Sequence, residues 1–175
     1  MKNLAIFYGG KSAEHDISII TAIQVMQNLD KNKYQIIPVY IDKNNNWISP
    51  KNFLDINIYA NNRIDGIRLA TGFFDKKLIK KSTFGYKHFE KVDVAINCCH
   101  GLNGEDGTLA GLLELNNIPY VGSGVVGSSV GMDKVLMKDV FIANNIPCAK
   151  YYYFTALEFE NEEEKILNEI EEKFG

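Results

Sequence analysis

The sequence predicts an α/β protein built around a buried parallel sheet. Two short apolar runs, residues 4–8 (Leu-Ala-Ile-Phe-Tyr) and 92–96 (Val-Asp-Val-Ala-Ile), are typical of strands that are covered on both faces. A glycine-rich polar loop follows each run, at residues 9–15 and 100–107. Since α/β proteins bind ligands at the carboxyl ends of parallel strands, the two loops predict a single site for a polar ligand.

The first part of the chain opens with a βαβ unit. Apolar residues at helical spacing predict a helix over residues 18–29, and residues 34–41 are typical of the next strand. Residues 42–91 are less regular. The elements expected there are a turn at 44–46, a short strand from Trp47, lysines 76–81 in a solvated loop or hairpin flank, and residues 67–69 paired antiparallel with 84–89.

The rest of the chain returns to regular helix-to-strand units. The expected elements are a strand at 92–97, a helix at 108–116, a strand at 120–121, a glycine- and serine-rich segment at 122–129, a helix at 132–144, a strand at 148–155 and an acidic helix at 161–174. Asparagines precede Pro119 and Pro147 in similar connectors, where they tolerate the left-handed conformation that ends helices. The final glycine, Gly175, directly follows a helix and indicates a boundary inside a larger protein.

The composition indicates an ordinary soluble protein. The 175 residues suffice for one domain or for one domain and part of another, and the 46% hydrophobic and 23% charged shares exclude disordered and fibrous classes. With 19 basic against 22 acidic residues and no concentrated basic face, the chain is not expected to bind nucleic acid. No apolar run approaches the ~20 residues of a membrane helix, so no membrane partner is expected.

The cysteines predict a reducing compartment. Cys98, Cys99 and Cys148 match neither a disulfide framework nor a metal-binding spacing, which indicates a cytoplasmic protein. Cys98 and Cys99 stand beside His100, so thiol catalysis is one interpretation. Two cysteines that end a buried strand are more often small core residues, and we favour that interpretation.

The first loop combines small residues with a carboxylate. Ser12 is expected to cap the following helix or to donate to an anion there. Glu14 does not suit an anion site, but it suits an ammonium group, such as the amine of an amino acid. The alternative is that Glu14 only completes a helix cap.

The second loop also combines glycines with polar side chains at the end of a strand. His100 ends the strand and is expected to donate to a carboxylate or phosphate oxygen while Glu14 holds an amine. A purely structural histidine is the alternative. Glu105 and Asp106 also have an alternative role as acidic residues at a helix start, where the helix dipole favours them.

Three motifs resemble the D-alanine–D-alanine ligase family. They are Gly9-Gly10-Lys11-Ser12-Ala13-Glu14-His15-Asp16-Ile17-Ser18, His100-Gly101-Leu102-Asn103-Gly104-Glu105-Asp106-Gly107, and Pro119-Tyr120-Val121-Gly122-Ser123-Gly124 followed by Met132-Asp133-Lys134. The resemblance implies a Rossmann-like (pre-ATP-grasp) amino-terminal domain at residues 1–130. Residues 131–175 would then form the truncated start of the ATP-grasp central domain.

The resemblance also implies an activity and a set of site residues. The family uses ATP to convert the carboxylate of one D-alanine into an acyl phosphate, which the amine of a second D-alanine attacks to give a product for peptidoglycan. Carried over by motif, Glu14 holds the ammonium of the first D-alanine, Ile17 lines its pocket and Ser18 lies beside it. His100 contacts the carboxylate or acyl phosphate, and Glu105 is a partner of His100.

The resemblance limits what this chain is expected to do alone. Lys134 corresponds to a lysine that reaches ATP, but the family's metal ligands lie beyond Gly175, so ATP and Mg²⁺ are expected in the full-length enzyme and no metal site is expected here. The fragment alone is expected to be inactive. Ala110 stands where a glutamine is common, and its polar contact is therefore expected to be missing. The family is generally dimeric, which implies a homodimer.

Two other functions are open at this point. One is a ligase that joins D-alanine to D-lactate or D-serine, because the second-substrate pocket lies largely outside these residues. The other is a complete small-molecule-binding or dimerisation module without catalysis.

Overall fold

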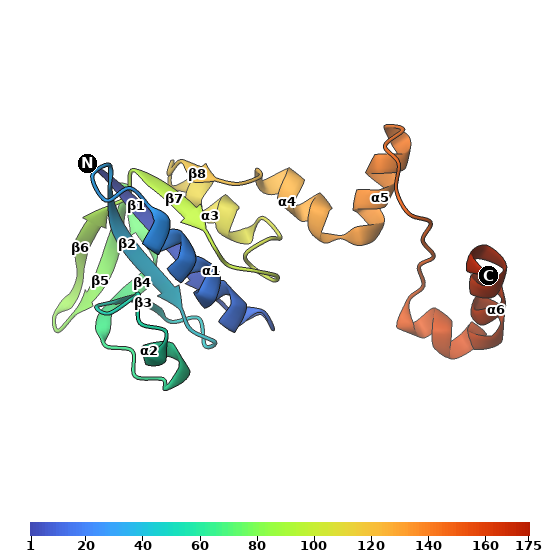
Figure 1. The fold of residues 1–175 in the computed structure, drawn as a ribbon, viewed down its shortest axis with the longest axis horizontal. Helices are drawn as coiled ribbons and strands as arrows, with labels where there is room; N and C mark the ends of the chain where they lie inside the picture. Colours follow the sequence, from blue (N-terminus) through green and yellow to red (C-terminus); the bar gives the residue numbers. More distant parts are fainter. The chain divides into compact units, whose positions relative to one another are not determined.

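The computed structural model describes residues 1–175, which divide into two compact units, Met1–Met132 and Asp133–Gly175 (Figure 1). The strands of the first unit are β1 (Lys2–Gly9), β2 (Tyr34–Ile41), β3 (Trp47–Pro50), β4 (Gly66–Phe74), β5 (Lys77–Ser82), β6 (Gly85–Lys91), β7 (Val94–Asn97) and β8 (Tyr120–Val121). Its helices are α1 (His15–Asn28), α2 (Asn57–Ala60), α3 (Thr108–Leu115) and α4 (Val125–Met132). The second unit contains α5 (Lys134–Ala143) and α6 (Ala156–Phe174).

The first unit contains one mixed sheet of eight strands in the order β6-β5-β4-β3-β2-β1-β7-β8. Strands β2, β1, β7 and β8 are parallel to their neighbours in that half of the sheet. The predicted α/β fold with a parallel, Rossmann-like sheet is therefore confirmed. The strand predicted from residue 92 begins at Val94, because Asp93 lies in a bend before it.

The core lies on both faces of β1. Leu4, Ile6 and Tyr8 belong to a cluster that includes the buried side chains of α1. The alternate residues Ala5 and Phe7 belong to a second cluster that includes the buried leucines of α3. Because successive strand residues point to opposite faces, a central strand covered by helices on both faces is apolar throughout, as residues 4–8 are.

The antiparallel half of the sheet corrects one prediction. Residues 67–69 do not pair with 84–89, because β5 lies between β4 and β6 and pairs with both. Asp75 and Lys76 both have positive φ, 50° and 58°, and form the two-residue turn that joins β4 to β5. Lys76 lies in this turn, and Lys77, Lys80 and Lys81 lie in β5. Of the two predicted alternatives for these lysines, the hairpin flank is therefore correct.

Helix α4 is a second correction. The glycine- and serine-rich segment was predicted to lead into a helix from 132, but it is helical from Val125 to Met132. Glycine and serine have low helix propensity, so contacts elsewhere in the fold must supply the stability. The Ser129 hydroxyl lies 2.8 Å from the backbone oxygen of Asp106, to which it donates, and α4 packs on α3.

The helix ends at the two asparagine connectors are confirmed. Asn117 and Asn145 have φ values of 53° and 56°, in the left-handed region. At the end of α3, the amide of Ile118 donates to Leu113 O, and that of Asn117 donates to Glu114 O. This pair of hydrogen bonds is the Schellman arrangement, which satisfies the last carbonyl groups of a helix.

The second unit differs from its prediction in two places. Residues 148–155 contain no strand, since no other segment pairs with them; Lys138 Nζ donates to Ala149 O at 3.0 Å instead. Helix α6 begins at Ala156 rather than 161. Thr155 and Glu158 form a capping box that starts the helix there, a pattern that the sequence itself carries.

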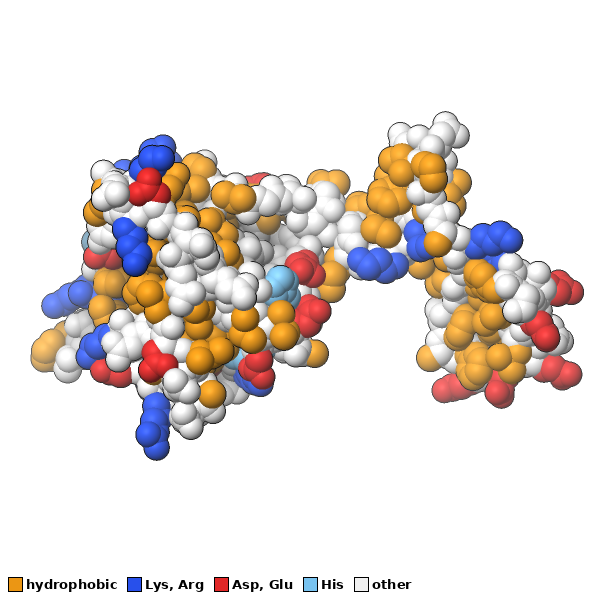
Figure 2. All heavy atoms as spheres, viewed as in Figure 1, with side chains coloured by type: hydrophobic (Ala, Val, Ile, Leu, Met, Phe, Trp, Pro, Cys, Tyr) orange, Lys and Arg blue, Asp and Glu red, His pale blue; other side chains and the backbone are white.

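Charged side chains are distributed differently over the first unit and over α6. In the view of Figure 2, Lys and Arg side chains are scattered over the first unit, and acidic side chains gather on α6. None of the helices is both long and apolar enough to cross a membrane.

Candidate functional site

The first loop leaves β1 through two glycines with positive φ. Gly9 and Gly10 have φ values of 90° and 95°, and a Cβ atom on Gly9 would lie 2.2 Å from the backbone oxygen of Ile41. The amide of Gly10 donates to that same oxygen at 2.8 Å. Glycine is required at position 9 because its φ is positive and the end of β2 leaves no room for a side chain.

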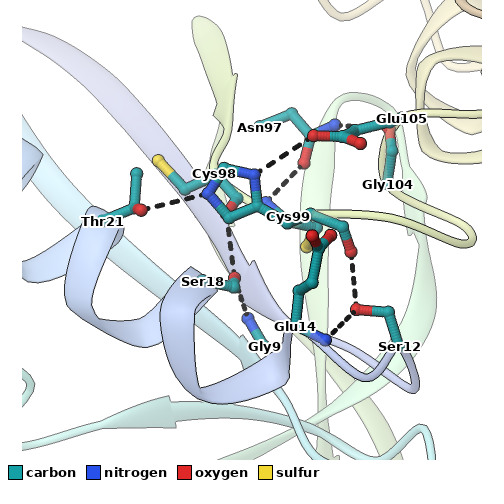
Figure 3. A network of polar contacts seen from close by, with 11 residues as sticks. Gly9, Ser12, Glu14, Ser18, Thr21, Asn97, Cys98, Cys99, Gly104 and Glu105 are labelled. Atoms are coloured by element: carbon teal, nitrogen blue, oxygen red, sulfur yellow. Dashed lines mark hydrogen bonds and ion pairs between the residues drawn. The ribbon is translucent and has the colours of Figure 1, made fainter.

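Ser12 does not cap α1. Glu14, not Ser12, is the N-cap residue of α1, and no side chain caps the helix. The Ser12 hydroxyl instead donates to the backbone oxygen of His100 at 2.6 Å and accepts from the Glu14 amide at 3.2 Å (Figure 3). Ser12 therefore joins the two loops to each other.

Glu14 lies at the junction of the two loops. Its side chain makes no capping hydrogen bond, so the alternative of a helix-capping carboxylate is wrong. The residue is exposed, and a Cβ atom on Gly101 would lie 3.1 Å from Glu14 Oε2. The lack of a side chain at Gly101 thus leaves room for this carboxylate beside the second loop.

The His100 ring is held at both nitrogens. Nδ1 lies 3.1 Å from Glu105 Oε1, and Nε2 lies 3.0 Å from Thr21 Oγ1 on α1. The His100 side chain is 31% exposed, so one part of the ring is open to a ligand. The sequence interpretation paired Glu105 with His100 but missed Thr21, which no local motif connects to residue 100.

Ser18 is a structural residue of the site. It is fully buried, accepts a hydrogen bond from the Gly9 amide at 2.7 Å and donates to Cys98 O at 2.8 Å. These bonds tie the ends of β1 and β7 to α1. Ile17, the preceding residue, is 56% exposed.

His15 supports the first loop from its other end. It is 3% exposed, its Nδ1 donates to Gly10 O at 2.6 Å, and its Nε2 accepts from the Tyr40 hydroxyl at 3.1 Å. Burial raises the pKa of Tyr40 to about 12, so its hydroxyl keeps its proton at neutral pH. The ring of His15 is therefore a buried structural element.

Asp106 organises the start of α3. Its carboxylate accepts from the Asn103 amide at 2.8 Å and from the Thr108 amide at 2.9 Å. Partial burial opposes ionisation of this carboxyl, but the amide donors, Thr108 first, outweigh it and hold the pKa of Asp106 below its usual range. The alternative role at a helix start is therefore correct for Asp106.

The cysteines beside His100 are core residues. Cys98 and Cys99 are 4% and 7% exposed. Burial raises the pKa of the Cys98 thiol to about 11 and that of the Cys99 thiol to about 12, so both are neutral at pH 7. Thiol catalysis is thereby disfavoured, because the thiolate is the nucleophile.

Lys134 lies in the second unit. It is exposed and is the first residue of α5. The preceding residue, Asp133, caps this helix by accepting from the amides of Val135 and Leu136 at 2.9 and 3.0 Å. Ala110, in the first unit, is 6% exposed and lies in α3.

A cavity of about 410 Å³ borders both loops beside α3. Gly10 and Lys11 line it from the first loop, and Leu102 and Asn103 line it from the second. Glu14 and His100 do not belong to its wall. No group of three or more histidine, cysteine, aspartate or glutamate side chains is arranged to hold a metal ion.

The fold and the paired loops define an α/β domain that presents a polar site at the carboxyl edge of a parallel sheet. A family model described as "D-ala D-ala ligase N-terminus" matches residues 3–123. The chain therefore belongs to the D-alanine–D-alanine ligase family, as its three motifs predict. It is 37% identical over 180 residues to the D-alanine–D-alanine ligase of Bacillus pumilus, an alignment that covers 99% of this chain and 48% of the relative.

Solved structures show the same fold. The D-alanine–D-alanine ligase from Coxiella burnetii matches with a TM-score of 0.81 and 30% identity, over 96% of this chain and 49% of that one. The VanG D-Ala:D-Ser ligase from Enterococcus faecalis matches with a TM-score of 0.77 and 28% identity, over 99% and 49%. A Bacillus anthracis D-alanine–D-alanine ligase complexed with ATP matches with a TM-score of 0.54 and 26% identity, over 92% and 44%. The chain spans about half the length of the curated relatives it matches.

Proposed function

We propose that this chain supplies the first-substrate site of an ATP-dependent ligase that joins two D-alanine molecules for peptidoglycan synthesis. The observation that carries the proposal is the hydrogen bond of 2.6 Å from the Ser12 hydroxyl to His100 O, because it joins the loop of Glu14 to the loop of His100. Membership of the ligase family supplies the substrate class.

Each site residue has a proposed role. The exposed Glu14 carboxylate accepts hydrogen bonds from the ammonium of the first D-alanine, an interaction worth ~1.5–3 kcal/mol. Ile17, also exposed, lines the part of the site that receives this D-alanine. His100 contacts the carboxylate or acyl phosphate of that substrate, and Glu105 orients its ring. Ser18 is buried beneath the two loops and shapes the site through Gly9 and Cys98 rather than by touching the substrate.

The proposed reaction uses positioning and charge stabilisation by these residues. ATP supplies the phosphoryl group that activates the carboxylate of the first D-alanine as an acyl phosphate. The amine of the second D-alanine then forms the amide bond, and phosphate leaves. Glu14 and His100 fix the first substrate by its two charged ends, so that its carboxylate is presented in one orientation.

The ATP and magnesium sites need residues beyond this chain. We assign residues 131–175 to the start of an ATP-grasp domain, in which the exposed ammonium of Lys134 suits a phosphate of ATP. The side chains of this chain do not fit a magnesium site, since no suitable group of ligands converges, and we derive no step through the metal. A homodimer in the cytoplasm is part of the proposal.

A second candidate is ligation of D-alanine to D-serine or D-lactate. The observation that supports this candidate is the similarity to a D-Ala:D-Ser ligase, at 28% identity. Product analysis of the complete protein, supplied with D-alanine and each alternative second substrate, distinguishes the candidates by the mass of the dipeptide or depsipeptide.

Two experiments test the proposal. The complete protein is assayed for phosphate release from ATP that depends on D-alanine; no such release would refute the ligase function.

The second experiment is an NMR titration of the ¹⁵N-labelled chain with D-alanine. It is repeated with a Glu14→Gln variant and with a control variant, Glu90→Gln on β6. We expect shifts in residues 9–18 and 100–107 that Glu14→Gln abolishes and Glu90→Gln preserves. Equal shifts in Glu14→Gln would refute the role of Glu14.

A further inference from the structure

The contacts of His100 define the hydrogen-bonding state of its ring. An ionised carboxylate only accepts hydrogen bonds, so the Glu105 oxygen at 3.1 Å requires a hydrogen on Nδ1. In the neutral ring Nε2 is then an acceptor, and the Thr21 hydroxyl at 3.0 Å donates to it. The neighbours of the ring thus select one tautomer.

Thr21 lies on a part of α1 that hydrogen bonds of Ser18 anchor to the ends of β1 and β7. It lies one helical turn after Ser18, on the same side of α1, and Figure 3 shows both side chains directed towards the loop after β7. Ser18 anchors α1 to Cys98 O at 2.8 Å, two residues before His100. The Ser18 bond thus fixes α1 against the second loop at a point one helical turn from Thr21.

We propose that Thr21 is a positioning residue that holds His100 in one orientation in both of its protonation states. A hydroxyl can donate to the bare Nε2 of the neutral ring and, after rotating, accept from Nε2–H of the imidazolium. Glu105 accepts from Nδ1–H in both states, so a change of charge on His100 requires no movement of the ring. The benefit for the first D-alanine rests on the substrate role proposed above for His100.

The direct test observes the ring nitrogens of His100 by NMR. In the ¹⁵N-histidine-labelled chain we expect a protonated Nδ1 and a hydrogen-bonded Nε2 on His100. Thr21→Val keeps the shape and the branched side chain but removes the hydroxyl, so its Nε2 resonance should move towards that of an unbonded imine nitrogen. Thr21→Ser should restore it. His15 and His88 in the same sample are internal controls, since neither contacts Thr21 in the structure.

The functional test uses the complete protein. We expect Thr21→Val to raise the KM for D-alanine about fivefold, the factor of one neutral hydrogen bond, with Thr21→Ser close to wild type. Unchanged His100 resonances in Thr21→Val would refute the contact, and changed resonances with unchanged kinetics would refute the positioning role. A complete protein without D-alanine-dependent phosphate release would refute the ligase function, while the NMR result would still decide whether Thr21 orients the ring.

Discussion

The Ser12 hydroxyl donates to the backbone oxygen of His100 at 2.6 Å and thereby joins two loops that are 88 residues apart in the sequence. Both loops follow neighbouring parallel strands, β1 and β7. The acceptor is the backbone oxygen of His100, so the bond fixes the position of the main chain from which the His100 side chain extends. The site is consequently a junction of loops rather than a pocket within one of them.

We expect Ser12→Ala to weaken the site more than the fold. The free energy of unfolding should fall by about 1 kcal/mol, the usual contribution of one such hydrogen bond. The affinity for D-alanine should fall as well, because the two loops are no longer joined. Urea unfolding and an NMR titration measure the two effects. Thr at the same position keeps the hydroxyl, and a Ser12→Thr variant as weak as Ser12→Ala would contradict this explanation.

Ser18→Ala should destabilise the whole first unit. The Gly9 amide and the Cys98 carbonyl would both lose a buried hydrogen-bond partner. Each unsatisfied buried group costs about 1–3 kcal/mol, so the free energy of unfolding should fall by about 3 kcal/mol in total. Denaturant unfolding monitored by the fluorescence of Trp47 is a suitable measurement. The control is Ser128→Ala, whose exposed hydroxyl donates at 3.3 Å, and a loss no larger than in this control would show that the Ser18 bonds contribute little.

Gly104→Ala should displace the second loop. A Cβ atom there would lie 2.6 Å from Cys99 Cβ and 2.8 Å from Cys99 O, so the backbone must move. We expect a loss of about 2 kcal/mol of stability, typical of overpacking, and altered NMR resonances for His100. Gly124→Ala is the matched control because that glycine has open space and no positive φ. Similar results for the two variants would argue against the steric explanation.

Only one of the three cysteines should react in the folded protein. Cys148 is exposed, whereas Cys98 and Cys99 are buried and their pKa values are raised to about 11 and about 12. At pH 8 a thiol-specific disulfide reagent should therefore label one thiol per chain at once and three after unfolding. Mass spectrometry identifies the labelled residue, and rapid native labelling of Cys98 or Cys99 would show that the end of β7 opens easily.

Stability should decline at alkaline pH. The folded pKa values of Cys98 and Cys99 lie above their ordinary value of 9.0, so burial of the neutral thiols stabilises the fold fully below pH 9. This stabilisation is lost as the pH rises through about 11 and 12. Urea unfolding at pH 8 and pH 10.5 should show the loss, and a Cys98→Ala/Cys99→Ala variant should show less of it. Equal pH dependence in the two proteins would assign the effect to other groups, such as Tyr40 and Tyr59, whose pKa values burial also raises.

Local signals in the sequence were sufficient for much of the fold. The apolar run at residues 4–8 predicted the central strand, and the asparagine before Pro119 predicted the left-handed residue that ends α3. The predictions that failed concern segments whose conformation depends on contacts with distant parts of the chain. Helix α4 forms from poor helix formers because it packs on α3, and residues 148–155 form no strand because no neighbouring strand pairs with them.

The candidate site divides in the same way. The sequence by itself determined the two loops, the ligase family and the pair His100 and Glu105, because each depends on residues that are close together in the chain. Only the tertiary structure decided that Ser12 binds the second loop, that Ser18 is buried between two strand ends and that Thr21 reaches the His100 ring. A hydroxyl group can pair with any nearby donor or acceptor, so its partner is set by the register of α1 against the sheet and not by its neighbours in sequence.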